Sequence, residues 1–146
     1  MATYSHILLA ADFNPDFNEV VARAKQLRDA FQCKLSLIHV IEPVTLAYGG
    51  EMPIDLSVLH DELRNQAQTQ LNQLATELGV DANSVFLEFG VVEREMMRVV
   101  KEQNVDLIVV GSHGKRGWAL LLGSTANAVL HQAPCDVLAV RVHKPK

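Results

Sequence analysis

The 146-residue sequence has few cysteines and no long apolar run. Cys33 and Cys135 are far apart, and neither has a second ligand at metal-site spacing, which argues against a metal or redox centre. No apolar run reaches the roughly 18 to 20 residues that span a bilayer. The N-terminus, MATYSHILLA, lacks the basic segment that begins a signal peptide. We therefore expect a cytoplasmic protein without a membrane partner.

The sequence also lacks an excess of positive charge and any recognisable catalytic motif. Thirteen lysines and arginines against seventeen aspartates and glutamates give a net charge of −4. Non-specific nucleic-acid binding requires a basic face, so we expect no nucleic-acid partner. The six histidines are scattered, with no HExxH, no GxSxG and no Cys–His arrangement that the spacing supports. We accordingly expect a protein that is not an enzyme.

What the sequence does contain is an alternation of short apolar runs and amphipathic segments. The runs predict five strands and the amphipathic segments predict four helices. The predicted strands are His6–Ala11, Lys34–Ile41, Ser84–Phe89, Asp106–Val110 and Asp136–Val142, and the predicted helices are Phe17–Phe31, Leu56–Leu78, Glu93–Gln103 and Ser124–His131. This order predicts a single domain over residues 1–146, an α/β fold in which a doubly wound parallel sheet carries helices on both faces.

The apolar spacing within the helices predicts which side chains are buried. Val58 and Leu71 fall on the apolar side of the helix at 56–78, and Gly79 is suited to end that helix. Met96 and Met97 fall on the apolar side of the helix at 93–103, where methionine more often fills a core than forms a ligand surface.

The segment Val105–Asn127 joins a predicted strand, a glycine-containing loop and a helix start. Gly111 and Gly114 follow the apolar run, and Gly123-Ser124-Thr125 precedes the next predicted helix. Glycine lets the main chain approach an anion closely, and the free N–H groups of a helix N-terminus face negative charge. The segment therefore predicts a cradle for the phosphates of a nucleotide. The alternative is that the glycines only permit tight turns, because the spacing fits neither GxxxxGK[ST] nor GxGxxG.

The predicted strand ends favour the nucleotide interpretation. Asp12 ends the first strand, His39 and Val40 end the second, Gly90 and Val91 follow the third, and Gly111 follows the fourth. In doubly wound sheets, ligands bind outside the carboxyl ends of the strands, where the strand order reverses. We expect these residues to meet in one crevice.

Four stretches of the sequence carry a wider pattern: ILLAAD at Ile7–Asp12, LIHV at Leu37–Val40, DLIVVGSHG at Asp106–Gly114 and LLGSTANAVLHQAPCDVLAVR at Leu121–Arg141. Together they resemble the universal stress proteins over essentially the whole chain. The resemblance implies a five-stranded parallel sheet with the strand order 3-2-1-4-5. It also implies a homodimer in which the last strands of two subunits, here Asp136–Val142, pair antiparallel.

Members of that family that bind ATP resemble the pattern Gly-x2-Gly-x9-Gly-[Ser/Thr]. Here Gly111 and Gly114 fit the first part and Gly123-Ser124 supplies the closing pair, but the spacer at 115–122 has eight residues. If the missing residue falls in the loop, the phosphate-binding ends keep their places. If it falls in the turn before Gly123, the cradle is displaced.

Carried over by position, the resemblance implies a role for each matching residue. Asp12 would accept hydrogen bonds from the ribose or the adenine edge, and Val40 would pack on the adenine. The phosphates would be held by Gly111, Gly114, Gly123, Ser124 and Thr125. The alternatives are structural: Asp12 and Ser124 are suited to cap helices, and Val40 to fill the core. Mg²⁺ could bridge the phosphates, although no protein carboxylate pair argues for it.

We therefore expect a dimeric stress-response regulator that binds ATP or a related adenine nucleotide. One alternative is a nucleotide-free dimeric regulator of the same fold, in which the short spacer has abolished the site. Another is a weak ATPase, although no general base and arginine pair is identifiable.

Overall fold

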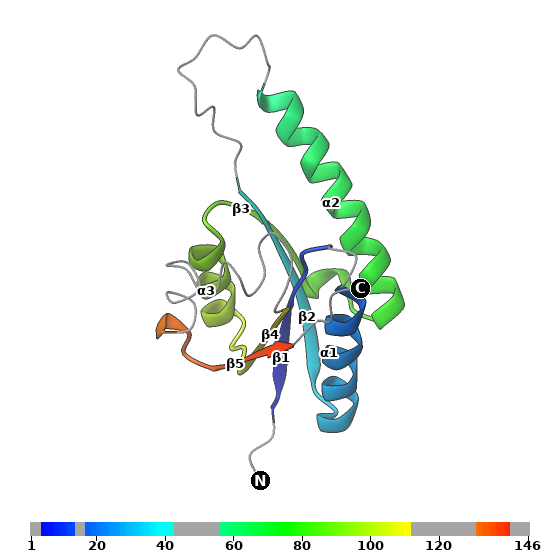
Figure 1. Ribbon diagram of the computed structural model, residues 1–146, viewed down its shortest axis with the longest axis vertical. Coiled ribbons are helices and arrows are strands. Elements are labelled where there is room, and N and C mark those ends of the chain that lie inside the picture. Colours follow the sequence, from blue (N-terminus) through cyan, green and yellow to red (C-terminus); the bar gives the residue numbers. More distant parts are fainter. Residues whose placement is uncertain (1–3, 14–16, 43–55, 112–130, 141–146) are drawn as a thin grey trace, which may run out of the picture.

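A computed structural model of the protein describes residues 4–13, 17–42, 56–111 and 131–140. Within these residues five strands form one parallel sheet in the order β3-β2-β1-β4-β5 (Figure 1). The strands are β1 His6–Ala10, β2 Lys34–Ile41, β3 Val85–Phe89, β4 Leu107–Gly111 and β5 Asp136–Val140. The helices are α1 Phe17–Phe31, α2 Leu56–Leu78 and α3 Val92–Glu102, with a short 3-10 turn at Ala82–Ser84. The predicted α/β class and strand order are confirmed.

The predicted boundaries agree with the structure for three elements and differ slightly for the others. The helices α1 and α2 and the strand β2 have the predicted bounds, and the other elements differ by one or two residues at their ends. Ser84 belongs to the 3-10 turn and not to β3. Of the helix predicted at 124–131, His131 is helical, as is the next residue, Gln132, and the rest lies outside the described residues. The last two residues of the predicted strand at 136–142 also lie outside them.

The helices pack on both faces of the sheet. The helices α1 and α2 cover one face (Figure 1), where Val20 and Leu71 belong to the same hydrophobic cluster as Leu9 and Leu37. The helix α3 covers the other face, where Met96 joins Leu8, Ile38 and Ile108 in a second cluster. A doubly wound sheet is therefore confirmed, because each face buries the apolar side of at least one helix.

Buried side chains agree with the predicted helix faces except near the start of α2. Met96 and Met97 are buried, as predicted. Val58 is 52% exposed, so its predicted burial is wrong. The first turns of α2 extend beyond the strands in Figure 1, and the buried residues of this helix begin at Ala67. The apolar spacing of α2 thus begins before the part of the helix that packs on the sheet.

The helix α2 ends at Gly79, as predicted. Gly79 has a φ of 68°, in the left-handed region that glycine tolerates best. Its N–H donates to the carbonyl of Thr76, and the N–H of Val80 donates to the carbonyl of Ala75 at 2.8 Å. This pair of bonds is a Schellman motif, which satisfies carbonyls that the helix end would otherwise leave unpaired. The Arg28 guanidinium also donates to the carbonyl of Leu78, which joins α1 to the end of α2.

Polar groups join the strands at their amino ends. The Asp106 carboxylate accepts hydrogen bonds from the backbone N–H groups of Ser5 at 2.8 Å and His6 at 2.9 Å, and from the Ser5 hydroxyl at 2.9 Å. Partial burial works to raise the pKa of Asp106, but these donors together outweigh it, and the pKa is lowered. The charged carboxylate therefore ties the start of β1 to the start of β4.

His6 is buried in the same region and bridges three parts of the chain. Its Nδ1 lies 2.9 Å from the carbonyl oxygen of Gln103, and its Nε2 lies 2.6 Å from the hydroxyl of Ser36. A carbonyl oxygen only accepts, so Nδ1 donates, and in the neutral ring Nε2 accepts from Ser36. Burial is the main cause that lowers the pKa of His6, against the opposing effect of the Gln103 hydrogen bond.

This buried histidine makes stability depend on pH. Because the pKa of folded His6 lies below that of the unfolded chain, its contribution is complete above about pH 6.5 and is lost as the pH falls. We expect the free energy of unfolding to drop by on the order of 1 kcal/mol more in the wild type than in His6→Asn between pH 7 and pH 5.5. Urea unfolding at one fixed protein concentration measures this difference. Equal pH dependence in the two proteins would contradict it.

Candidate functional site

The carboxyl ends of β1 and β4 separate at the middle of the sheet. These two strands pair from Ile7↔Leu107 to Leu9↔Val109, and the pairing ends there. Each strand then continues with its outer neighbour, because β1 pairs with β2 up to Ala10↔Ile38 and β4 pairs with β5 up to Gly111↔Val140. The strand order reverses between β1 and β4, and ligands of doubly wound sheets bind at such a point.

Asp12 and Gly111 flank this separation. Ala11 follows β2 beyond the end of β1, because its N–H donates to the carbonyl of Ile38 at 2.8 Å. Asp12 is the next residue and is half-buried. On the other side, Gly111 is buried at the end of β4 and pairs with Val140 of β5. The carboxylate of Asp12 and the glycine at position 111 thus lie on opposite sides of one opening.

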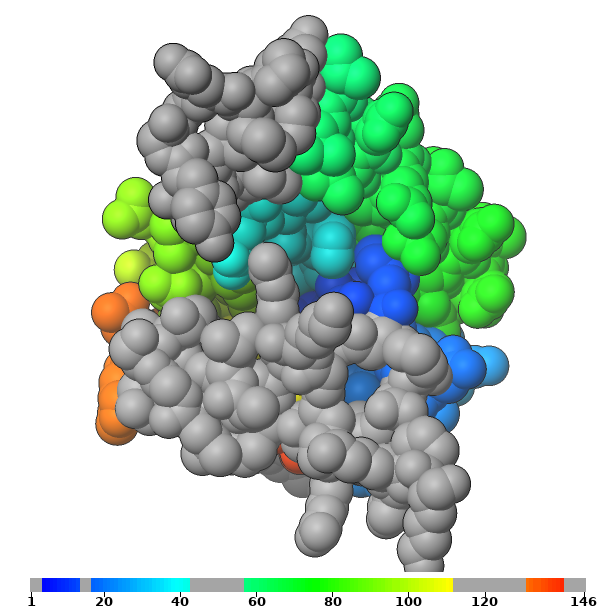
Figure 2. All heavy atoms as spheres, turned by 45° about the horizontal axis from the view of Figure 1, so that its top comes forward, coloured from blue at the N-terminus to red at the C-terminus, as the bar shows by residue number. Residues whose placement is uncertain are grey.

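Val40 lies at the carboxyl end of β2, on the face of the sheet that α3 covers. Successive side chains of a strand point to opposite faces, and Val40, Ala10 and Val110 all pack with the cluster of α3. Val40 is half-buried, so part of its side chain remains accessible beside that cluster. Figure 2 shows the ends of β1 and β2 coming forward between α2 and α3.

The structure therefore brings together those predicted site residues that it describes. Asp12, Val40 and Gly111 lie at the carboxyl ends of the three central strands. The other predicted phosphate contacts, Gly114, Gly123, Ser124 and Thr125, lie outside the described residues.

Gly90, which follows β3, is required by its own turn. It has a φ of 146°, and a Cβ atom there would lie 3.2 Å from Cγ of Glu95. Its N–H donates to the carbonyl of Ile41 at 3.0 Å, so the turn is held to the end of β2. The glycine is thus explained by backbone geometry alone, without a ligand.

Two further residues lie beside Asp12: His39, which the sequence places with Val40 at the end of β2, and Phe13. The Nδ1 atom of His39 lies 2.6 Å from the carbonyl oxygen of Ala11. The ring of His39 lies 5.0 Å from the ring of Phe13, which has a φ of 57°. The sequence places His39 at the end of β2 beside Val40, but its contact with Ala11 depends on the register of β1 against β2.

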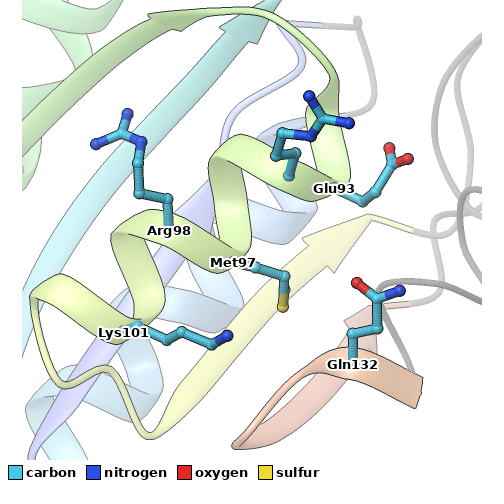
Figure 3. A pocket seen from close by; sticks show the side chains of 6 residues that line it. Glu93, Met97, Arg98, Lys101 and Gln132 are labelled. Atoms are coloured by element: carbon cyan, nitrogen blue, oxygen red, sulfur yellow. The ribbon is translucent and has the colours of Figure 1, made fainter.

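A separate hollow of about 430 Å³ lies on the outer side of α3, next to Gln132 (Figure 3). Its lining includes Arg98, whose guanidinium pairs with carboxylates at 3.0 to 3.3 Å, those of Glu88, Glu95 and Glu102. The Glu95 hydrogen bond is the main cause that raises the Arg98 pKa, followed by opposing burial and then the contacts with Glu88. In Figure 3 the Arg98 side chain points away from Gln132. The lining of the hollow does not include Asp12, Val40 or Gly111, so the hollow is distinct from the opening at the strand ends. Through its pair with Glu88, Arg98 joins α3 to β3.

Within the described residues, no helix is long and apolar enough to cross a membrane. No group of three or more histidine, cysteine, aspartate or glutamate side chains is placed there to hold a metal ion.

Comparison with known proteins gives consistent matches over the whole chain. A sequence model of the universal stress protein family matches residues 3–141. Universal stress protein A homolog 1 of Coxiella burnetii is 41% identical over 138 residues, covering 94% of this chain and 96% of that protein. Homolog 2 of the same organism is 38% identical over 146 residues, covering 97% of this chain and 98% of that protein.

Solved structures show the same fold at lower sequence identity. The universal stress protein UspA from Lactobacillus plantarum superposes with a TM-score of 0.77 at 23% identity, covering 97% of this chain and 100% of that one. A universal stress protein in complex with cAMP superposes with a TM-score of 0.62 at 22% identity, covering 96% of this chain and 98% of that one. At these identities the likeness concerns the fold, and function has to be argued from the site.

Proposed function

This chain belongs to the universal stress protein family, and we propose that it is a dimeric stress-response regulator that binds an adenine nucleotide, ATP or a related one. The nucleotide would bind at the carboxyl ends of β1, β2 and β4. Its occupancy would set the conformation or the partner choice of the dimer, which requires that the nucleotide bind two states with different affinities.

The observation that carries this proposal is the separation of β1 and β4, with Asp12 on one side and Gly111 on the other. A carboxylate at the end of a strand accepts hydrogen bonds from ribose hydroxyls or from the adenine edge. Val40 offers an apolar surface on the adjacent strand. A glycine across the opening removes the Cβ atom that would keep a phosphate away from the backbone.

The phosphate part of the proposal rests on the sequence. Gly114, Gly123, Ser124 and Thr125 would supply backbone N–H and hydroxyl donors, and Mg²⁺ bound with the nucleotide would neutralise phosphate charge. The solved relative in complex with cAMP supports an adenine nucleotide as the ligand class. The eight-residue spacer at 115–122 is the feature that weighs toward a nucleotide-free regulator of the same fold.

The dimer part of the proposal rests on the strand β5. This strand is one edge of the described sheet, with β4 as its one neighbour, and Val137, Leu138 and Ala139 on it are half-buried. An apolar edge strand invites pairing with another chain, and pairing of two such strands across a two-fold axis would cover both edges.

We expect wild-type protein stripped of ligand to bind ATP with micromolar affinity in calorimetric titration. Asp12→Ala should weaken binding by about tenfold or more, because a hydrogen bond to a charged group contributes about 1.5 to 3 kcal/mol. Gly114→Val should weaken it as well, by blocking the backbone approach. Asp29→Ala is the matched control, since Asp29 is an exposed aspartate on α1, and it should bind like the wild type.

Wild-type protein that ignores millimolar ATP with Mg²⁺ would overturn the nucleotide proposal and favour the nucleotide-free regulator. The same samples test the ATPase alternative by release of phosphate. We expect none above the background. Turnover that Asp12→Ala abolishes while ATP still binds would show an enzyme instead.

We expect the protein to sediment at twice the mass of one chain and Leu138→Arg to sediment as a monomer. The new charge would lie on β5, where antiparallel pairing of the two subunits would bury it. Leu87→Arg makes the same change on β3, the opposite edge, and should remain dimeric. A monomeric wild type would contradict the dimer, and dissociation by both variants alike would contradict its placement on β5.

A further inference from the structure

We propose that His39 is the positioning residue for Asp12, fixing the backbone on both sides of the carboxylate without contacting the nucleotide itself. This inference deepens the proposed nucleotide site and rests on it for its binding consequences. The contacts among the described residues carry the positional part independently.

The first contact of His39 fixes the residue before Asp12. Nδ1 of His39 lies 2.6 Å from the carbonyl oxygen of Ala11. Because a carbonyl only accepts, Nδ1 carries the proton in this contact, and the bond sets the orientation of the ring. The N–H of Ala11 is also held by β2, through the carbonyl of Ile38 at 2.8 Å. Both peptide groups of Ala11 are therefore tied to neighbouring residues of β2.

The second contact of His39 fixes the residue after Asp12. The rings of His39 and Phe13 lie 5.0 Å apart at 51°, and the ring of Phe13 lies 6.1 Å from that of Phe17. Phe13 has a φ of 57°, a left-handed conformation that is uncommon for a bulky residue and persists only where surrounding contacts hold it. The imidazole of His39 and the ring of Phe17 supply such contacts.

Together these contacts determine where the Asp12 side chain leaves the main chain. Asp12 lies between the residue bonded to Nδ1 and the residue whose ring lies against the imidazole, so one imidazole sets the backbone conformation on both sides of it. The left-handed turn at Phe13 redirects the chain directly after the carboxylate. Loss of the imidazole would free Phe13 to relax toward ordinary values of φ and would release the carbonyl of Ala11.

His39 acts from the face of the sheet opposite to Val40. Alternation along β2 puts His39 on the side of Leu37, which packs beneath α1 and α2, whereas Val40 packs with the cluster of α3. The imidazole is thus separated by the strand itself from the surface where Val40 would meet adenine. A binding group held in place before the ligand arrives loses less conformational entropy on binding, so the effect of His39 on affinity passes through Asp12.

The test compares three single variants with the wild type, using ATP and inorganic tripolyphosphate as separate probes in calorimetric titrations. His39→Ala should weaken ATP binding by about five- to tenfold, the range expected for loss of one hydrogen bond, and should leave tripolyphosphate binding unchanged. His39→Asn should recover only part of the affinity, because its amide N–H₂ can replace Nδ1 as donor but no ring remains to contact Phe13. Phe31→Ala, which removes a ring from the opposite end of α1, should bind both probes like the wild type.

A double variant separates positioning from a direct contact. If His39 acts through Asp12, then adding His39→Ala to Asp12→Ala should cause no further loss of ATP affinity. Additive losses would overturn the inference, as would a His39→Ala protein that binds ATP like the wild type. If His39→Ala does not fold, Phe13→Ala decides: weaker ATP binding with unchanged tripolyphosphate binding supports the inference, and unchanged ATP binding overturns it.

Backbone NMR of the ligand-free proteins distinguishes failure of this inference from failure of the nucleotide proposal. The chemical shifts of Phe13 should report a left-handed φ in the wild type and an averaged value in His39→Ala. If the wild type binds neither probe, the nucleotide proposal fails, and this comparison still decides the positional role. An unchanged Phe13 in His39→Ala would overturn it.

Discussion

The separation of β1 from β4 follows from the order in which the chain builds the sheet, and it places the proposed site. Right-handed crossovers put α1 and α2 on one face of the sheet as the chain moves outward from β1 to β3. The chain then returns through α3 on the other face and adds β4 on the free side of β1. Beyond Leu9 and Val109, β1 pairs only with β2 and β4 pairs only with β5. An opening therefore forms between β1 and β4 at their carboxyl ends.

The amino ends of the strands carry hydrogen bonds that stabilise the sheet, whereas the carboxyl ends form the proposed binding site. At the amino ends, the Asp106 carboxylate and the buried imidazole of His6 join β1 to its neighbours through hydrogen bonds between residues far apart in the sequence. At the carboxyl ends the same strands part, and Asp12 and Gly111 are left beside the opening. A change at one end can therefore alter stability while leaving the proposed site in place, which makes the two roles separable by mutation.

Much of this fold follows from local sequence patterns, and the remainder depends on tertiary contacts. The apolar period and flanking residues of α1, α2 and β2 predict their bounds, and Met96 and Met97 are buried as their spacing indicates. The exposure of Val58 could not be predicted, because the apolar spacing of a helix does not show where the sheet beneath that helix ends. The contact of His39 with Ala11 depends on the register of β1 against β2, which a single sequence does not specify. The convergence of Asp12, Val40 and Gly111 was predictable, since it requires only the strand order.

An adenine nucleotide that binds where β1 and β4 separate would change the surroundings of the backbone amides at these strand ends. Titration of isotope-labelled protein with ATP and Mg²⁺, followed by backbone amide NMR, tests both the binding and its place. We expect saturable shifts at Asp12, Val40 and Gly111, at the carboxyl ends of three strands, with little change at Arg98 and Lys101 on the outer side of α3. A spectrum that does not change, or that changes only around the hollow on α3, would contradict it.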